Sequence, residues 1–170
     1  MERSQRRREM ITVGLFLIYA VFLSWIILFK MCLPGDVLPH LRNLNLIPFA
    51  GALVVNGKAD YTEVVQNLIA FIPFGVYMGV MKPGAPFLKK LLPAACVSLA
   101  YEALQYALAL GATDITDLIS NTAGAAAGIG IYRILAVVCK EKTHWIINIL
   151  AGTATACAVL FLSILLAANH

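Results

Sequence analysis

Five long apolar segments constrain the fold of this chain more than any other feature of its sequence. They cover approximately residues 11–29, 62–81, 88–110, 114–138 and 145–168. Each is about 19 residues or longer, which is the length an α-helix needs to cross the hydrocarbon core of a bilayer. With 61% hydrophobic and 13% charged residues, the chain is far more apolar than a soluble domain. The sequence therefore predicts an all-α integral membrane protein, a helical bundle of about five spans forming one domain over residues 1–170.

The longest connection, residues 30–61, separates the first two apolar segments. Prolines and glycines interrupt it at Pro34, Gly35, Pro39, Pro48, Gly51 and Gly57, so no long helix is expected there. The connection is nevertheless partly apolar, for example at residues 46–49 and 52–55. We expect an irregular outer loop that lies in the membrane interface or re-enters the protein, where its backbone groups can find partners.

The distribution of basic residues predicts how the spans are oriented. If the N-terminus starts in the cytoplasm and the five spans alternate, ten basic residues face the cytoplasm and three, Lys30, Arg42 and Lys58, face out. Short cytoplasmic loops carry an excess of lysine and arginine in multi-pass membrane proteins. The N-terminus is therefore predicted to be cytoplasmic and the C-terminus extracytoplasmic. The 30–61 loop and the turn at residues 111–113 then share the outer face.

Polar side chains inside the apolar segments are the candidate functional residues, because such groups are costly in a bilayer unless they are paired or used. From the rise of 1.5 Å per helical residue, Asn67, Glu102 and Asn121 are expected at similar depths in the outer half of the membrane. Ser98 and Gln105 lie four residues before and three residues after Glu102. These spacings place all three side chains on one helix face.

A second polar face is predicted on the next helix. Asp114, Asp117 and Asn121 follow one another at spacings of three and four residues, which places them on one side of a helix. Because only a short turn joins segments 88–110 and 114–138, the two helices are expected to be antiparallel neighbours. The two polar faces can therefore meet.

Four sequence motifs resemble those of the VanZ-like membrane-protein family. They are, in chain order, NLIPF at 45–49, NLIAFIPFG at 67–75, EALQ at 102–105 and TDITDLISNTAG at 113–124. The resemblance covers about residues 42–135, which we take as a VanZ-like core. It implies a multi-pass protein of the bacterial cell membrane, associated with resistance to the glycopeptide antibiotic teicoplanin. It implies no particular reaction.

The leading hypothesis is an outward-facing polar pocket between the second, third and fourth helices that binds a lipid, glycolipid or glycopeptide-related envelope component. In this hypothesis Arg42 holds an anionic group and Glu102 is the central charge. The candidate ligand-binding residues are Arg42, Asn45, Asn67, Glu102, Gln105, Asp114, Asp117 and Asn121. The expected partners are membrane lipids or lipid-linked envelope precursors, with a glycopeptide antibiotic as a further candidate. No cofactor and no bound metal are predicted.

The alternative function is an intramembrane hydrolase or transferase that acts on a lipid-linked envelope substrate, with Glu102 as general base. In that case Asp114 and Asp117 would position water or a metal ion. The sequence contains no G-x-S-x-G, H-E-x-x-H or P-loop motif, so it favours a protein without catalytic activity.

Structural roles are open for several of the same residues. Asp114 and Asp117 can serve as the N-cap and third residue of a helix, and Arg42 and Glu102 can form a structural ion pair. Gly124 and Gly128 form a small-xxx-small face that favours close helix packing, and an oligomer through this face is possible. Orientation and contact with anionic lipids account for the basic N-terminus, so nucleic-acid binding is not predicted.

Overall fold

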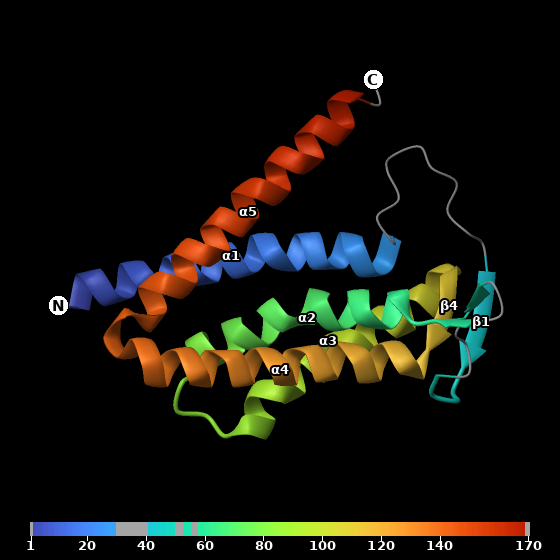
Figure 1. The fold of residues 1–170 in the computed structure, drawn as a ribbon, viewed down its shortest axis with the longest axis horizontal. Coiled ribbons are helices and arrows are strands. Elements are labelled where there is room, and N and C mark those ends of the chain that lie inside the picture. Colours follow the sequence, from blue (N-terminus) through green and yellow to red (C-terminus); the bar gives the residue numbers. More distant parts are fainter. Residues whose placement is uncertain (1, 30–40, 50–52, 56–57, 169–170) are drawn as a thin grey trace. The chain divides into compact units, whose positions relative to one another are not determined.

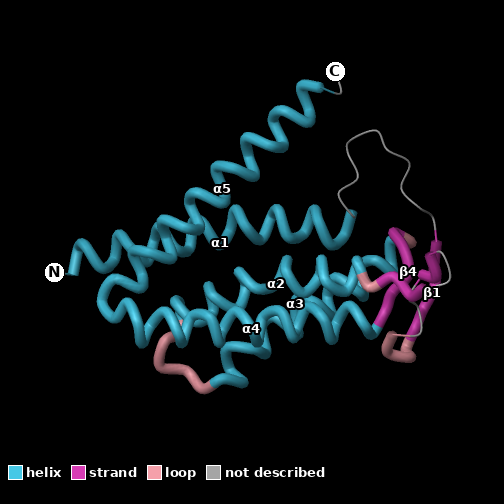
Figure 2. Tube along the Cα trace, viewed as in Figure 1, coloured by secondary structure: helices cyan, strands magenta, loops and turns pink. Residues whose placement is uncertain are grey.

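A computed structural model describes residues 2–29, 41–49, 53–55 and 58–168. Helices dominate the described chain, which confirms the all-α class (Figures 1 and 2). The elements in chain order are α1 (Glu2–Phe29), β1 (Leu41–Asn45), β2 (Leu53–Val55), β3 (Lys58–Asp60), α2 (Thr62–Met81), α3 (Phe87–Leu108), β4 (Leu110–Asp114), α4 (Ile115–Cys139), the 3-10 turn η1 (Lys140–Lys142) and α5 (Thr143–Ala168).

Four helical stretches of the described chain are long and apolar enough to cross a membrane. They are Gln5–Phe29, Thr62–Met81, Phe87–Leu108 and Ile115–Leu165. The last stretch runs through α4, η1 and α5, for which the sequence predicts two spans. The prediction of about five spans is therefore close. Large apolar side chains such as Val21, Leu88 and Val137 are more than 70% exposed on these helices, as expected for surfaces that face lipid.

Two details of the chain path differ from those expected from the sequence. First, α1 begins at Glu2 and not near residue 11, because its arginine, glutamate and glutamine residues are good helix formers. Second, the described parts of the 30–61 connection contain three short strands, and the expected turn at residues 111–113 lies within β4. The rest of that connection lies outside the described residues.

Contacts along the chain divide it into two compact units, residues 1–21 with 134–170, and residues 22–133. In the first unit, Thr12 on α1 is 1% exposed. Its hydroxyl group donates to Oδ1 of Asn148 on α5 at 2.9 Å or to the carbonyl oxygen of Arg8 at 3.0 Å. A buried polar contact therefore links the two helices within this unit, where a polar group without a partner would be costly.

The second unit contains a parallel strand pair, β1 with β4, whose register runs from Leu41 opposite Leu110 to Asn45 opposite Asp114. Both strands lie at one end of α2, α3 and α4, where Figure 2 draws them in magenta. The other strand pair, β2 with β3, is antiparallel. The β1–β4 pair brings residues 41–45 to the start of α4.

Glycines allow α2 and α4 to approach closely within the second unit. A Cβ atom added at Gly124 would lie 2.9 Å from the carbonyl carbon of Leu68, and one at Gly128 would lie 3.0 Å from that of Ile72. Both distances are too short for ordinary van der Waals contact. The two glycines thus pack against α2 of the same chain, and an oligomer through them stays a prediction.

Candidate ligand-binding cleft

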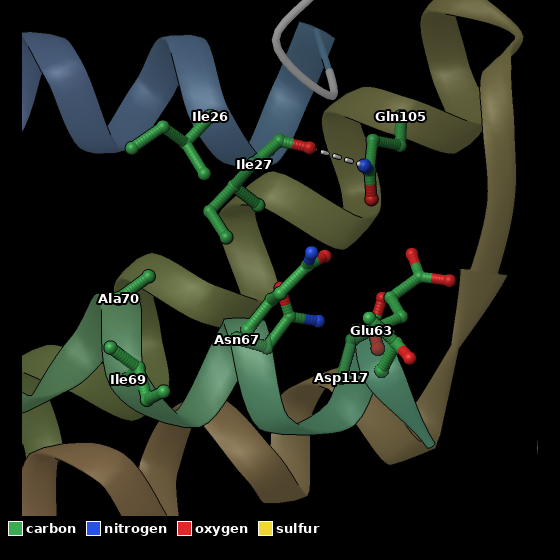
Figure 3. A pocket seen from close by; sticks show the side chains of 10 residues that line it. Ile26, Ile27, Glu63, Asn67, Ile69, Ala70, Gln105 and Asp117 are labelled. Carbon is green, nitrogen blue, oxygen red and sulfur yellow. Dashed lines mark hydrogen bonds between the residues drawn. The ribbon is translucent and has the colours of Figure 1, made fainter. Parts of the chain in front are cut away.

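A cleft of about 520 Å³ lies in the second unit, between the C-terminal part of α1, the first half of α2, α3 and the start of α4. Its volume is in the range of small-molecule binding sites. The described residues that line it are Ile26, Ile27, Thr62, Glu63, Gln66, Asn67, Ile69, Ala70, Gln105 and Asp117 (Figure 3). The lining thus combines apolar side chains from α1 and α2 with amide and carboxylate groups from α2, α3 and α4.

Gln105 is fixed in the cleft by contacts at the end of α3. The helix ends because Ala109 adopts a left-handed conformation with φ of 55°, and its N–H donates back to the carbonyl oxygens of Gln105 and Tyr106. The Gln105 side chain is 1% exposed, and its Nε2 donates to the carbonyl oxygen of Ile27 at 2.8 Å (Figure 3). That oxygen is among the last four carbonyls of α1, which have no partner within their helix. Gln105 therefore ties α3 to the end of α1.

Glu102 connects α3 to the strand that precedes α4. It is 4% exposed, and its Oε2 accepts a hydrogen bond from the backbone N–H of Asp114 at 2.9 Å. The Thr113 hydroxyl group donates to the backbone carbonyl oxygen of Glu102 at 3.1 Å. The described residues that line the cleft do not include Glu102. Its carboxylate thus fastens the β4–α4 junction to α3.

Asp114 is the N-cap of α4, which is the structural role that the sequence left open beside ligand binding. Its Oδ1 accepts from the backbone N–H of Thr116 at 2.7 Å, which satisfies one of the free N–H groups of the first turn. Its Oδ2 accepts from Nδ2 of Asn45 at 2.9 Å, across the β1–β4 pair. In a capping box, the third helical residue accepts from the N–H of the N-cap. Here Glu102 accepts that bond, and the third helical residue, Asp117, lines the cleft.

Asn121 contacts α3 at a separate point. Its side chain is fully buried, and its Nδ2 donates to the Ser98 hydroxyl group at 2.9 Å. Ser98 is also fully buried. This side-chain hydrogen bond connects α4 to α3, and Asn121 is not among the described lining residues.

The predicted site residues thus separate into groups. Asn67, Gln105 and Asp117 come together at the cleft, whereas Asn45, Glu102 and Asp114 gather at the β4–α4 junction, and Asn121 pairs with Ser98. The backbone of Arg42 lies opposite Gly111 in the β1–β4 pair, and its side chain lies outside the described residues. Within the described chain, no three His, Cys, Asp or Glu side chains are grouped so that they could hold a metal ion.

Sequence reasoning missed several lining residues. Glu63 lies four residues before Asn67, so helical spacing could have placed both on one face. For Gln66, next to Asn67, the polarity of its side chain was the only sequence feature that could have indicated a place in the cleft. No sequence feature indicated Ile26 and Ile27, because an apolar residue at the end of an apolar helix looks the same whether it faces lipid or a cleft.

Comparison with known proteins identifies the family of this chain. The family model described as VanZ/LLP1 matches residues 16–136. Protein VanZ of Enterococcus faecium is 38% identical over 130 residues, which are 74% of this chain and 76% of that protein. No solved structure matches the chain significantly. The matched region includes every described residue that lines the cleft and the whole β1–β4 pair. This chain therefore belongs to the VanZ/LLP1 family.

Proposed function

We propose that the protein binds the polar head group of a lipid, glycolipid or other lipid-linked envelope component in the cleft of its second unit. The observation that carries this proposal is the convergence of Asn67, Gln105 and Asp117, from three different helices, on one cleft. Ionisable and amide groups in membrane helices are costly unless they serve a ligand or a partner. The apolar side chains of Ile26, Ile69 and Ala70 offer a surface for the hydrophobic part of such a molecule.

Membership in the VanZ/LLP1 family supports an association with teicoplanin resistance, and that association makes an envelope component the natural ligand. We place the N-terminus in the cytoplasm and the C-terminus outside, because this topology puts ten basic residues inside and three outside. The start of α2, the end of α3 and the start of α4 are then at the outer surface. In this orientation the cleft opens into the outer half of the membrane.

The proposed role of Glu102 is to position the start of α4. By accepting the N–H of Asp114, it takes the place that Asp117 would have in a capping box, and Asp117 is directed to the cleft. An intramembrane hydrolase or transferase would instead need Glu102 as a base in contact with substrate. Glu102→Gln separates the two roles, since glutamine keeps an acceptor oxygen but cannot take up a proton. Positioning predicts near-normal function for this variant, and general-base catalysis predicts its loss.

The binding proposal is tested with Asn67→Ala and, as a matched control, Asn43→Ala, whose side chain is exposed on β1. The chain and both variants are expressed at equal levels in a teicoplanin-susceptible bacterium, and the detergent-purified proteins are compared by native mass spectrometry. We expect the parent and Asn43→Ala proteins to retain a lipid and to lower teicoplanin susceptibility, and Asn67→Ala to lose both. A folded Asn67→Ala protein with full lipid retention would show that the site is wrong. Unchanged susceptibility in cells that express the parent protein would show that the link to resistance is wrong.

A further inference from the structure

The hydrogen bond between Gln105 and Ile27 determines which atom of the Gln105 amide is left for a ligand. The carbonyl oxygen of Ile27 can only accept a hydrogen bond, so the NH₂ group of Gln105 must face it at 2.8 Å. The opposite orientation of the amide would bring two oxygens together. Oε1 therefore points away from Ile27, and Figure 3 shows this side chain at the cleft.

Oε1 of Gln105 is buried and has no hydrogen-bond partner among the described residues. A buried acceptor without a partner is unfavourable, and this one belongs to a side chain that lines the cleft and is only 1% exposed. A molecule bound in the cleft can satisfy it only with an N–H or O–H donor.

The charge of the cleft narrows the choice of donor. Glu63 and Asp117 contribute two carboxylates, and none of the described lining residues carries a positive charge. Asp117 is 8% exposed, so its interactions are less screened than those at a protein surface. A phosphate in direct contact with these groups would meet like charge, whereas a cation would be attracted.

We infer that the cleft holds a primary ammonium group, which donates to Oε1 of Gln105 and pairs with the carboxylates of Glu63 and Asp117. This inference rests on the proposed function and names the chemical class of the bound group. Neighbouring Ile26, Ile69 and Ala70 contact the methylene groups attached to the ammonium. A quaternary ammonium has the charge but no N–H, and a sugar or glycerol hydroxyl group has the donor but no charge. Each of these satisfies only half of the site.

Three lipids with a common phosphoglyceride core test the inference on the purified full chain. Phosphatidylethanolamine carries a primary ammonium, phosphatidylcholine a quaternary one and phosphatidylglycerol only hydroxyl groups. Native mass spectrometry with titrated lipid should show phosphatidylethanolamine binding about tenfold more tightly than either of the others, the difference expected for one charge-assisted hydrogen bond. If free ethanolamine displaces bound phosphatidylethanolamine, a soluble amine is sufficient for binding. If it does not, the ammonium must be part of a lipid head group. Equal or tighter binding of phosphatidylglycerol or phosphatidylcholine overturns the inference.

Charge variants locate the effect. Glu63→Gln changes an exposed side chain, so folding should be retained while affinity for phosphatidylethanolamine falls about two- to fivefold. Asp117→Asn, at a buried position, should cause a larger loss. Glu141→Gln, at an exposed position in the other unit, is the matched control and should leave all three affinities unchanged. If Glu63→Gln and Asp117→Asn leave the preference for phosphatidylethanolamine intact, the inference is wrong. If lipid retention depends on Asn67 but shows no head-group preference, the ammonium inference is wrong and the proposed binding site stands. If lipid retention does not depend on Asn67, the proposed binding site is itself wrong.

Discussion

Replacing Gly124 by alanine tests whether the close approach of α2 and α4 shapes the cleft. The added Cβ atom would lie 2.9 Å from the carbonyl carbon and 3.1 Å from the Cα atom of Leu68, and closer still to the carbonyl oxygen. These are backbone atoms of a packed helix, so they cannot rotate away as the end of a side chain could. To restore ordinary contact, the helices must separate locally by on the order of 1 Å, and overpacking of this kind costs about 1–3 kcal/mol.

Gly130→Ala is the matched control on the same helix. A Cβ atom at Gly130 would have nothing within 4 Å, so this substitution only removes the flexibility of a helical glycine. It should stabilise the protein by roughly 0.5–1 kcal/mol. The gain from replacing a helical glycine is common to both alanine variants, so they are expected to differ by the overpacking cost, about 1–3 kcal/mol in the free energy of unfolding.

The measurement is unfolding by sodium dodecyl sulfate in mixed micelles, followed by far-ultraviolet circular dichroism. Lipid retention is measured on the same samples, because Leu68 is next to Asn67 and Gly124 lies two turns beyond Asp117 on α4. We expect Gly124→Ala to lose stability and lipid together, and Gly130→Ala to keep both. Equal unfolding free energies for the two variants would refute the packing argument. Loss of stability with full lipid retention would show that the cleft does not depend on this contact.

Three further substitutions test single contacts. Asp114→Ala removes the N-cap of α4 and should cost about 0.5–2 kcal/mol, with faster hydrogen exchange in β1 because Asn45 loses its partner; unchanged exchange would contradict this. Ser98→Ala leaves the buried Asn121 amide without its acceptor, and should lower the free energy of unfolding by about 0.6–2 kcal/mol in the same assay. If Ser98→Ala causes the same loss in an Asn121→Ala background, the two side chains are not energetically coupled. Thr12→Val removes a buried hydroxyl group between α1 and α5 in the other unit, and should lower stability by about 0.6–2 kcal/mol without changing lipid retention; a change in retention would argue against separate roles for the units.

The helices were predictable from the sequence, but the strands were not. The second helix was expected over residues 62–81 and α2 covers Thr62–Met81, because a long apolar segment is bounded there by polar residues and a Lys82-Pro-Gly turn. Strands β1 and β4 are five residues each, and they pair with one another although α2 and α3 lie between them in the sequence. Their hydrogen bonds depend on this distant partner, and so short a segment carries no periodic pattern that would reveal it.

The same limit applies to the site. Helical geometry placed Asn67, Glu102 and Asn121 at a similar depth, and Gln105 and Asp117 on the faces of Glu102 and Asn121, because the rise and turn per residue are fixed. It could not distinguish the surroundings of Gln105 from those of Glu102, which is three residues earlier on the same face. Which neighbour each side chain reaches is decided by the β1–β4 pair and by the end of α1, and both are tertiary features.

The parallel β1–β4 pair also sets an order of events during synthesis. Residues 41–45 leave the ribosome well before residues 110–114, by roughly several seconds at ordinary translation rates. Until α2 and α3 are inserted, β1 has no strand to pair with, and neither Asn45 nor the carboxylate of Glu102 can reach Asp114. The first turn of α4 can therefore form its contacts with β1 and α3 only after residue 114 has been made, and a nascent chain arrested before that point lacks Asp117, which lines the cleft.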